Sequence, residues 1–356
     1  MRFPTMAAFM LGALAVQPSF AATFCATTAN QLQSALSSAA ANGESDEIRV
    51  KIGTYDVSNV DLVYDPPTAD NLDLTISGGW TPFFQNPCGI QLRDPWQTLL
   101  DGNDLGRILR MTVDDGQADI KVSQLVFMYG RVDPGAGAGL SISYGLGVTG
   151  TVSIERNVFL LNTADQSSAL SIQGGSLQKV TNNLFLSNQG STRSVAYLTT
   201  TGLFGVSFTN NTVLSNMHTN SNQPTLSIAA GRAFLANNNF WNNDGYDASL
   251  GSIGDRYAYN NNYQSLQLLG GEIVEDNLSV EPEYESGLFN YTPVRGSPLV
   301  DGGREPGGSP LWNLTDIDLN TSIRLVGAHV DIGAFENETI FVDGFDPGGP
   351  FGSAPG

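Results

Sequence analysis

The chain has 356 residues, 41% of them hydrophobic, so it is long enough to bury a large core. Its 40 glycines and its low charged fraction, 14%, are typical of a turn-rich β protein rather than a helical one. The net charge of −19 disfavours nucleic acid as a partner, because no basic cluster is present to release phosphate counterions. On average this charge also repels acidic polysaccharides, although a local basic groove would override the repulsion.

Residues 1–21 have the composition of a secretory signal peptide. Arg2 precedes an apolar stretch at 7–16, and Ser19 and Ala21 are the small residues expected before a cleavage site. No later stretch is long and apolar enough to span a membrane as a helix. We therefore expect an exported protein that is not membrane-spanning.

The mature chain should begin with an N-terminal cap at 22–45. Residues 29–42 have the pattern of an amphipathic helix, with Thr28 and Gln31 as a possible capping box and Gly43 as the stop. Such a helix would cover the open end of a strand-built core, which otherwise leaves unpaired strand edges exposed.

Two cysteines, Cys25 and Cys88, are present. In an exported protein an even pair most simply forms one disulfide. That bond would tie the cap onto the first coils and close a loop of about 60 residues, contributing about 4 kcal/mol in the chain-entropy model. A catalytic role for either cysteine is not expected.

Residues 46–280 contain a repeat with a period of 26–28 residues. Each copy places an asparagine, an apolar residue two positions later and a second asparagine five positions later: Asn157-Phe159-Asn162, Asn183-Phe185-Asn188, Asn211-Val213-Asn216 and Asn238-Phe240-Asn243. The residues before each copy alternate apolar and polar, as in a strand with one buried face. Three short strands per repeat predict an all-β, single-stranded right-handed parallel β-helix.

The first asparagines of these copies, Asn157, Asn183, Asn211 and Asn238, should form a structural ladder. Asparagine tolerates the left-handed backbone of a tight turn. Its amide also donates to and accepts from the same residue one coil away, because stacked coils are separated by about 4.8 Å.

Residues 281–336 lose the repeat, so we expect them to form a C-terminal cap over the far end, followed by a flexible tail at 337–356. Within the cap, Asp316, Asp318 and Asn320 have the alternating oxygen spacing of a calcium loop. Thr321 and Gly327 replace the glycine and glutamate of that motif, so an ordinary polar turn is the alternative. Calcium is thus a possible cofactor, and none is required.

Length variation among the coils concentrates between the second turn and the third strand. Stacking must place these segments along one edge of the cylinder, and insertions on one face of a solenoid often mark its binding face. We expect this loop edge to contact a polysaccharide or surface partner, through its most chemically capable residues, Arg131, Arg193, His218 and Tyr246. The alternative is that these loops vary only because they are exposed to solvent.

Catalytic motifs are weak. A polysaccharide lyase needs a basic residue near the sugar, and a glycoside hydrolase needs two carboxylates about 5–9.5 Å apart. Asp114-Asp115 is an adjacent acidic pair within the coils, and the following Gly116 favours a turn. Lys121 and Lys179 are in no recognisable motif. The weak catalytic candidates are therefore Arg131, Arg193 and His218.

Four stretches in this order resemble a family of bacterial exported right-handed β-helix proteins, the choice-of-anchor-Q type. They are 25–36 with Gly53-Thr-Tyr55, 74–80 with Cys88, the Asn-x-Phe coils, and 297–303 followed by 330–336. The tail segment 340–346 resembles a C-terminal signature of exported proteins in some Gram-negative bacteria. One departure is Asp316-Ile-Asp318-Leu-Asn320, where the family often has an Asp-Gly turn. The resemblance implies a β-helix secreted or placed on the outer surface, with no agreed catalytic residues.

These observations favour a non-catalytic, adhesin-like protein that binds carbohydrate or a surface partner along its loop edge. The alternative is a polysaccharide lyase or glycoside hydrolase that uses the same edge.

Overall fold

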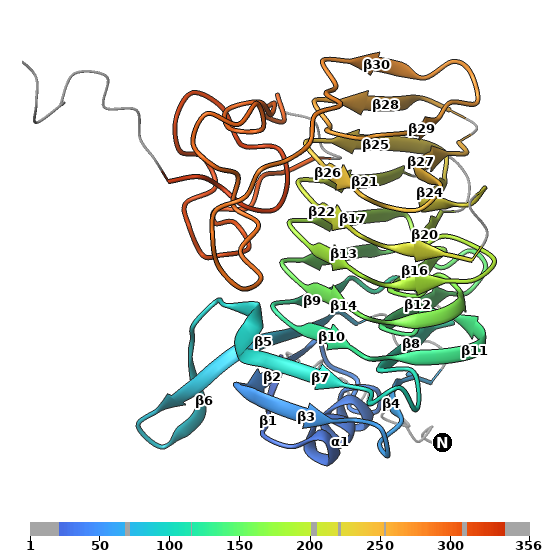
Figure 1. The fold of residues 1–356 in the computed structure, drawn as a ribbon. Helices are drawn as coiled ribbons and strands as arrows, with labels where there is room; N and C mark the ends of the chain where they lie inside the picture. Colours follow the sequence, from blue (N-terminus) through green and yellow to red (C-terminus); the bar gives the residue numbers. More distant parts are fainter. Residues whose placement is uncertain are drawn as a thin grey trace, which may run out of the picture.

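A computed structural model describes residues 21–67, 72–114, 116–200, 205–219, 222–252, 254–307 and 312–338. The proposed signal peptide, apart from Ala21, and the tail beyond Glu338 lie outside the described residues. The described chain winds into stacked coils whose strands pair in parallel (Figure 1). The predicted all-β parallel β-helix is thus confirmed.

Four sheets run along the stack. Sheet A contains β1 (Ala22–Ala26), β2 (Asp46–Lys51), β5 (Leu74–Phe83), β9 (Ile120–Ser123), β13 (Thr151–Glu155), β17 (Leu177–Thr181), β21 (Gly205–Thr209), β25 (Arg232–Ala236), β28 (Arg256–Tyr259) and β30 (Ile273–Glu275), with β6 (Asn86–Gln91) antiparallel to β5. Sheet B contains β3 (Gly53–Asp56), β7 (Thr98–Asp101), β10 (Val126–Met128), β14 (Val158–Leu160), β18 (Leu184–Leu186), β22 (Thr212–Leu214) and β26 (Asn239–Trp241).

Sheet C contains β4 (Leu62–Tyr64), β8 (Leu109–Val113), β12 (Leu140–Tyr144), β16 (Leu170–Gln173), β20 (Ala196–Thr199), β24 (Pro224–Ala229), β27 (Tyr246–Leu250) and β29 (Leu266–Gln267). Sheet D, between sheets B and C in four successive coils, contains β11 (Arg131–Ala136), β15 (Thr163–Gln166), β19 (Gln189–Gly190) and β23 (Met217–His218). Sheet D is built from the segments of variable length, so their predicted stacking along one edge is confirmed.

The helix α1 (Ala29–Ala39) covers the N-terminal end of the coils (Figure 1). The Thr28 hydroxyl accepts a hydrogen bond from the Gln31 N–H, while the Gln31 side chain accepts from Thr27 rather than Thr28. Four residues of one face, Leu32, Ala35, Leu36 and Ala39, are buried against the core. The helix ends three residues before the predicted limit.

The disulfide between Cys25 and Cys88 is formed, with Cα atoms 5.8 Å apart. It joins β1 to β6, the strand that returns antiparallel along β5. The predicted link between the N-terminal cap and the first coils is therefore confirmed.

A single interior column runs through sheet B. Strand pairing aligns, in order, Phe127, Phe159, Phe185, Val213 and Phe240. Where valine interrupts the phenylalanines, Phe208 enters from sheet A, and its ring centroid lies 5.8 Å from that of Phe185 and 6.1 Å from that of Phe240. The core therefore remains filled with aromatic rings through the coil that lacks one in sheet B.

The asparagine ladder stands at the turn between sheets A and B. Asn183 Oδ1 accepts from the backbone N–H of Asn157, and Asn211 Oδ1 accepts from that of Asn183. The left-handed conformation, however, falls on the residue before each ladder asparagine, such as Asn182 with φ of 55°. The expectation that the ladder asparagines adopt this conformation is wrong, because their side chains must point inward to bond the next coil.

The C-terminal segment, residues 281–307 and 312–337, packs along the side of the coils rather than over their far end (Figure 1). Its buried Leu319 and Phe335 contact the outer face of sheet B, where Val158, Leu160 and Leu184 are also buried. The predicted cap position is therefore wrong. Sheet B is apolar on both faces, and the C-terminal segment covers the outer one.

Candidate ligand-binding cleft

The outer face of sheet A presents a row of polar side chains. Because alternate residues of a strand face opposite sides, strand pairing places Glu47, Thr75, Lys121, Ser153 and Lys179 in one outward column. A parallel column contains Ser77, Ser123, Glu155 and Thr181. Hydroxyl groups and charges therefore alternate along a rigid floor.

This floor is the base of a cleft of about 540 Å³. One wall is formed by Trp80, Gln91 and Arg93, from the β5–β6 hairpin and the residues after it. The other wall is residues 313–316 of the C-terminal segment. Figure 1 shows the hairpin and this segment on the same side of the coils. Because the docking of the C-terminal segment completes the cleft, the repeat alone does not form it.

Most cations of the cleft have a partner. Lys121 Nζ lies 2.6 Å from Glu155 Oε2, and Arg93 Nη1 lies 2.9 Å from Asp316 Oδ2 across the two walls. Arg156 is buried and donates to the carbonyl oxygens of Asp318 and Arg93. Burial lowers the pKa of Arg156 to about 10, against the attraction of Asp318 and Asp316, and it remains a cation at neutral pH.

Trp80 supplies the apolar surface of the cleft. Its indole N–H donates to the Ser77 hydroxyl over 2.9 Å, which fixes the ring, and the Arg49 guanidinium lies 4.2 Å from the ring centroid. Arg49 in turn pairs with Glu47 over 2.7 Å. An aromatic ring held in this way beside hydroxyl groups can stack against a sugar or another flat apolar surface.

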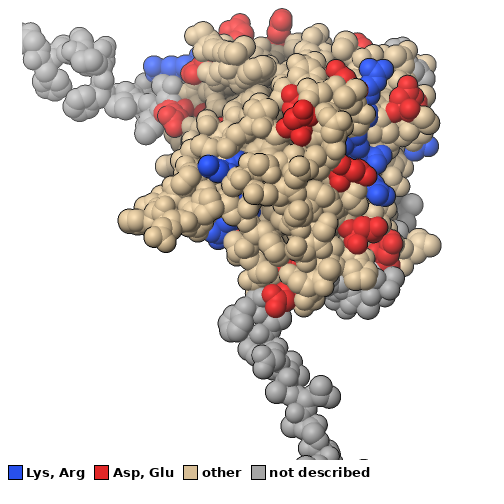
Figure 2. All heavy atoms as spheres, turned by 90° about the horizontal axis from the view of Figure 1, so that it is seen from below, with Lys and Arg blue, Asp and Glu red and all other residues tan. Residues whose placement is uncertain are grey.

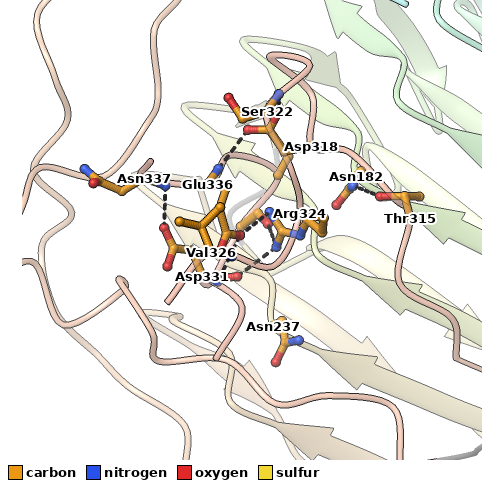
Figure 3. Close-up of polar contacts among 12 residues, drawn as sticks. Asn182, Asn237, Thr315, Asp318, Ser322, Arg324, Val326, Asp331, Glu336 and Asn337 are labelled. Carbon is orange, nitrogen blue, oxygen red and sulfur yellow. Dashed lines mark hydrogen bonds and ion pairs between the residues drawn. The ribbon is translucent and has the colours of Figure 1, made fainter. Parts of the chain in front are cut away.

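The wall at 313–316 is fastened to the coils by polar contacts (Figure 3). Asn182 donates to the Thr315 hydroxyl and to the Ile317 carbonyl, and Asn237 exchanges two hydrogen bonds with the backbone of Arg304. These asparagines are the left-handed turn residues, whose side chains project outward. The turn between sheets A and B therefore has two uses: its ladder asparagines bond inside the coils, and the asparagines before them bond the C-terminal segment.

Behind this wall, Arg324 and Glu336 form an ion pair that is almost completely buried, with Nη1 and Oε2 3.3 Å apart. Arg324 also donates to the carbonyls of Asp331 and Gly333. Burial raises the pKa of Glu336 to about 8 and that of Asp331 to about 6, against the attraction of Arg324. Burial therefore opposes the ionisation of both carboxyl groups, and more strongly that of Glu336.

The three calcium candidates have separate partners. Asp318 is buried, and its carboxylate accepts from the backbone N–H groups of Ser322 and Glu336, both over 2.8 Å (Figure 3). Asp316 is exposed and pairs with Arg93, whereas Asn320 donates to Thr292. The described residues contain no group of three or more His, Cys, Asp or Glu side chains arranged to hold a metal ion. Calcium binding stays a prediction.

The loop-edge candidates do not converge on one point. His218 is buried, its Nε2 lies 3.3 Å from the Thr225 hydroxyl, and burial lowers its pKa. Arg131 is exposed on β11, three strand spacings or about 14 Å from β23. Arg193 extends over the ring of Tyr197, 5.7 Å from its centroid. Tyr246 is half-buried at the start of β27.

The sequence analysis noted Lys121 and Lys179 but did not assign them to a site. They lie two strands apart in one outward column. The alternation of apolar and polar residues in their strands indicates that both lysines face outward, so the sequence could have predicted this column. Asp114 is exposed after β8, and Asp115 lies outside the described residues. Glu47 and Glu155 are three strand spacings apart, about 14 Å, which exceeds the separation a hydrolase uses.

Comparisons with protein-family models, with curated proteins and with solved structures gave no match. Among the residues that the structure describes, no helix is long and apolar enough to cross a membrane.

Proposed function

We propose that this chain is an exported β-helix protein that binds carbohydrate, without acting on it, in the cleft on the outer face of sheet A. The export and the secreted or surface location rest on residues 1–21 and on the resemblance to the choice-of-anchor-Q type. The proposal moves the contact surface from the loop edge to the cleft.

The lining of the cleft is the observation that carries this proposal. Its hydroxyl groups, lysines and carboxylates point outward from paired strands, so their spacing is fixed by the fold. Trp80 adds one apolar surface at the end of that row. A sugar chain presents hydroxyl groups along its length and apolar faces on its rings, and a rigid polar row beside an aromatic ring complements both.

The loop edge is the weaker candidate on geometry. His218, one of its three catalytic candidates, is buried, whereas Arg131 extends from β11 and Arg193 from the loop between β19 and β20, where it lies over Tyr197. A binding site needs side chains that converge on one ligand.

Binding is favoured over catalysis by the distance between Glu47 and Glu155 and by the ion pairs that engage Lys121 and Asp316. Glu47 and Glu155 stand too far apart for the two-carboxylate mechanism. Lys121 is tied to Glu155 rather than free to remove a proton from a sugar, so a lyase would have to use Lys179, which has no ion pair in the described part of the chain, as its base. A polysaccharide lyase or glycoside hydrolase remains the alternative that the experiment must exclude.

A steric block tests the proposal. Ser153 lies at the centre of the floor, between Lys121 and Lys179, so Ser153→Trp should fill the cleft. Thr163→Trp, on sheet D, is the matched control at the loop edge. Purified protein is screened on a glycan array, and hits are quantified by calorimetry. We expect Ser153→Trp to abolish binding and Thr163→Trp to leave it unchanged, with both variants retaining the wild-type circular dichroism spectrum.

The reverse pattern would return the site to the loop edge, and the absence of any glycan ligand would overturn the proposal. The same glycans are assayed for released reducing ends and for unsaturated uronate products. Turnover that Ser153→Trp abolishes would replace binding by catalysis.

A further inference from the structure

Lys179 differs from the other cations of the cleft. It is half-buried in the floor and has no ion pair among the residues that the structure describes. Lys121 and Arg93 each have a carboxylate partner, and Arg156 is engaged by carbonyl oxygens. Among the described cations that line the cleft, Lys179 is thus the one without a carboxylate or carbonyl partner. It is therefore the group on which an anionic ligand would act.

The surroundings of Lys179 suit a carboxylate or sulfate carried on a sugar. Ser153 lies beside it in its column, and Thr181, which also lines the cleft, lies two residues further along the same strand. An ammonium group offers three rotatable donors to an anion, while neighbouring hydroxyls can bond the hydroxyls of the same sugar ring. Charge-assisted hydrogen bonds of this kind are about twice as strong as neutral ones.

On the basis of the proposed function, we propose that the ligand is an anionic glycan. Lys179 binds one carboxylate or sulfate of this glycan, and the glycan chain runs along sheet A. Lys121 is in the same column, two strand spacings or about 10 Å away. Glu155 already neutralises it, so a second anionic group of the ligand would have to displace that carboxylate. Glu155 thereby selects against chains with a charge at both positions.

The net charge of the protein opposes such a ligand only at long range. Figure 2 shows acidic and basic side chains interspersed on the N-terminal face of the molecule. Charges separated by more than about 8 Å are largely screened at physiological salt, whereas a contact inside a cleft is screened much less. Affinity at physiological salt should therefore be governed by Lys179 rather than by the net charge of −19.

The experiment uses three probes on the full chain: an oligogalacturonate, a heparin-derived sulfated oligosaccharide and a neutral cello-oligosaccharide. Lys179→Ala should weaken binding of the anionic probe about tenfold or more, and should leave the neutral probe within about twofold. Glu155→Gln should strengthen anionic binding severalfold, because it releases Lys121. Arg110→Ala removes one exposed positive charge from sheet C and is the matched control, which should bind like the wild type.

The outcomes separate this inference from the proposed function. Preference for the uronate or for the sulfated probe, lost in Lys179→Ala, supports the inference and identifies the anion. Equal binding of neutral and anionic probes, unchanged in Lys179→Ala but blocked in Ser153→Trp, overturns the inference and keeps the proposed function. An equal loss in Arg110→Ala would show a general charge effect and also overturn the inference. Absence of binding to every probe and to the glycan array would overturn both.

Discussion

Asn183 accepts two hydrogen bonds from Asn157, one from the backbone N–H at 2.8 Å and one from the side-chain amide at 3.2 Å. Its own amide donates to the carbonyls of Ile154 and Thr181 and to Asn211 Oδ1. One fully buried side chain therefore satisfies backbone groups on its own coil and joins the two adjacent coils.

Asn183→Ala should be strongly destabilising for this reason. It leaves the Asn157 N–H and the Ile154 carbonyl buried without these partners, at a cost of about 1–3 kcal/mol each. We expect the free energy of unfolding to fall by about 2–5 kcal/mol in urea titration. Asn59→Ala, at an exposed turn, is the control and should change stability by less than about 0.5 kcal/mol. Equal stabilities of the two variants would show that the ladder is not a main source of stability.

The fold could be predicted because the repeat records it directly. Asn157, Asn183 and Asn211 recur at a nearly constant period, and a β-helix must place equivalent residues above one another. The apolar residues that flank Phe159 and Phe185, such as Val158 and Leu160, carry a signal that the sequence prediction leaves unused, because they are typical of a strand buried on both faces. That signal would predict a cover on sheet B, but it does not identify the C-terminal segment as the cover.

The cleft could not be predicted in the same way. Lys121 and Lys179 come from separate repeats, and Asp316 comes from a segment without any repeat. Strand stacking aligns the two lysines, but only the docking of that segment, through Asn182 and Arg156, adds Asp316 to the same cleft. Tertiary packing of a non-repetitive segment has no periodic signal, which is why the variable loops at sheet D looked like the better candidate.

The disulfide should contribute substantially to stability, because it closes a long loop. Cys25 and Cys88 are 63 residues apart, which corresponds to about 4 kcal/mol in the chain-entropy model. Reduction with dithiothreitol should therefore lower the Tm of the wild type. The Cys25→Ser/Cys88→Ser double variant should already have the lower Tm and should not respond to reductant. A wild-type Tm that is unchanged on complete reduction, confirmed by thiol counting, would contradict this expectation.

The buried carboxyl groups predict that stability falls as the pH rises. Burial raises the pKa of Glu336 to about 8 and that of Asp331 to about 6, from ordinary values of 4.5 and 3.8. In this window the folded protein retains protons that the unfolded chain has lost, so the free energy of unfolding decreases with pH. The contribution of these two carboxyl groups to the free energy of unfolding is greatest at a pH below their ordinary pKa values, and it is lost as the pH rises toward about 8.

Melting curves between about pH 5 and about pH 8 test this dependence. We expect the Tm of the wild type to drop by several degrees across the range, and Glu336→Gln, which keeps the neutral form, to show a smaller drop. Glu281→Gln, at an exposed carboxylate, is the control and should follow the wild type. A Tm that rises with pH, or an identical slope in Glu336→Gln, would contradict the prediction.

Phe208 and Val213 lie in one coil, and each has the side-chain size that is typical of the other's column. Val213 is the small residue between Phe185 and Phe240 in sheet B, while Phe208 is the large residue between Val180 and Leu235 in sheet A. The ring of Phe208 approaches those of both Phe185 and Phe240. The aromatic volume that sheet B lacks in this coil is thus supplied from the facing sheet.

A swap of the two residues should therefore be tolerated better than either change alone. Phe208→Val leaves a cavity, with a cost of about 2–4 kcal/mol, and Val213→Phe overfills a space already occupied, with a cost of about 1–3 kcal/mol. In the double variant the ring returns to the sheet B column, and we expect stability within about 1 kcal/mol of the wild type. Denaturant titration of the four proteins gives the coupling energy. Phe208→Val combined with Phe84→Ala, at a 91% exposed ring, should be additive, and additivity in the swap as well would refute the shared aromatic space.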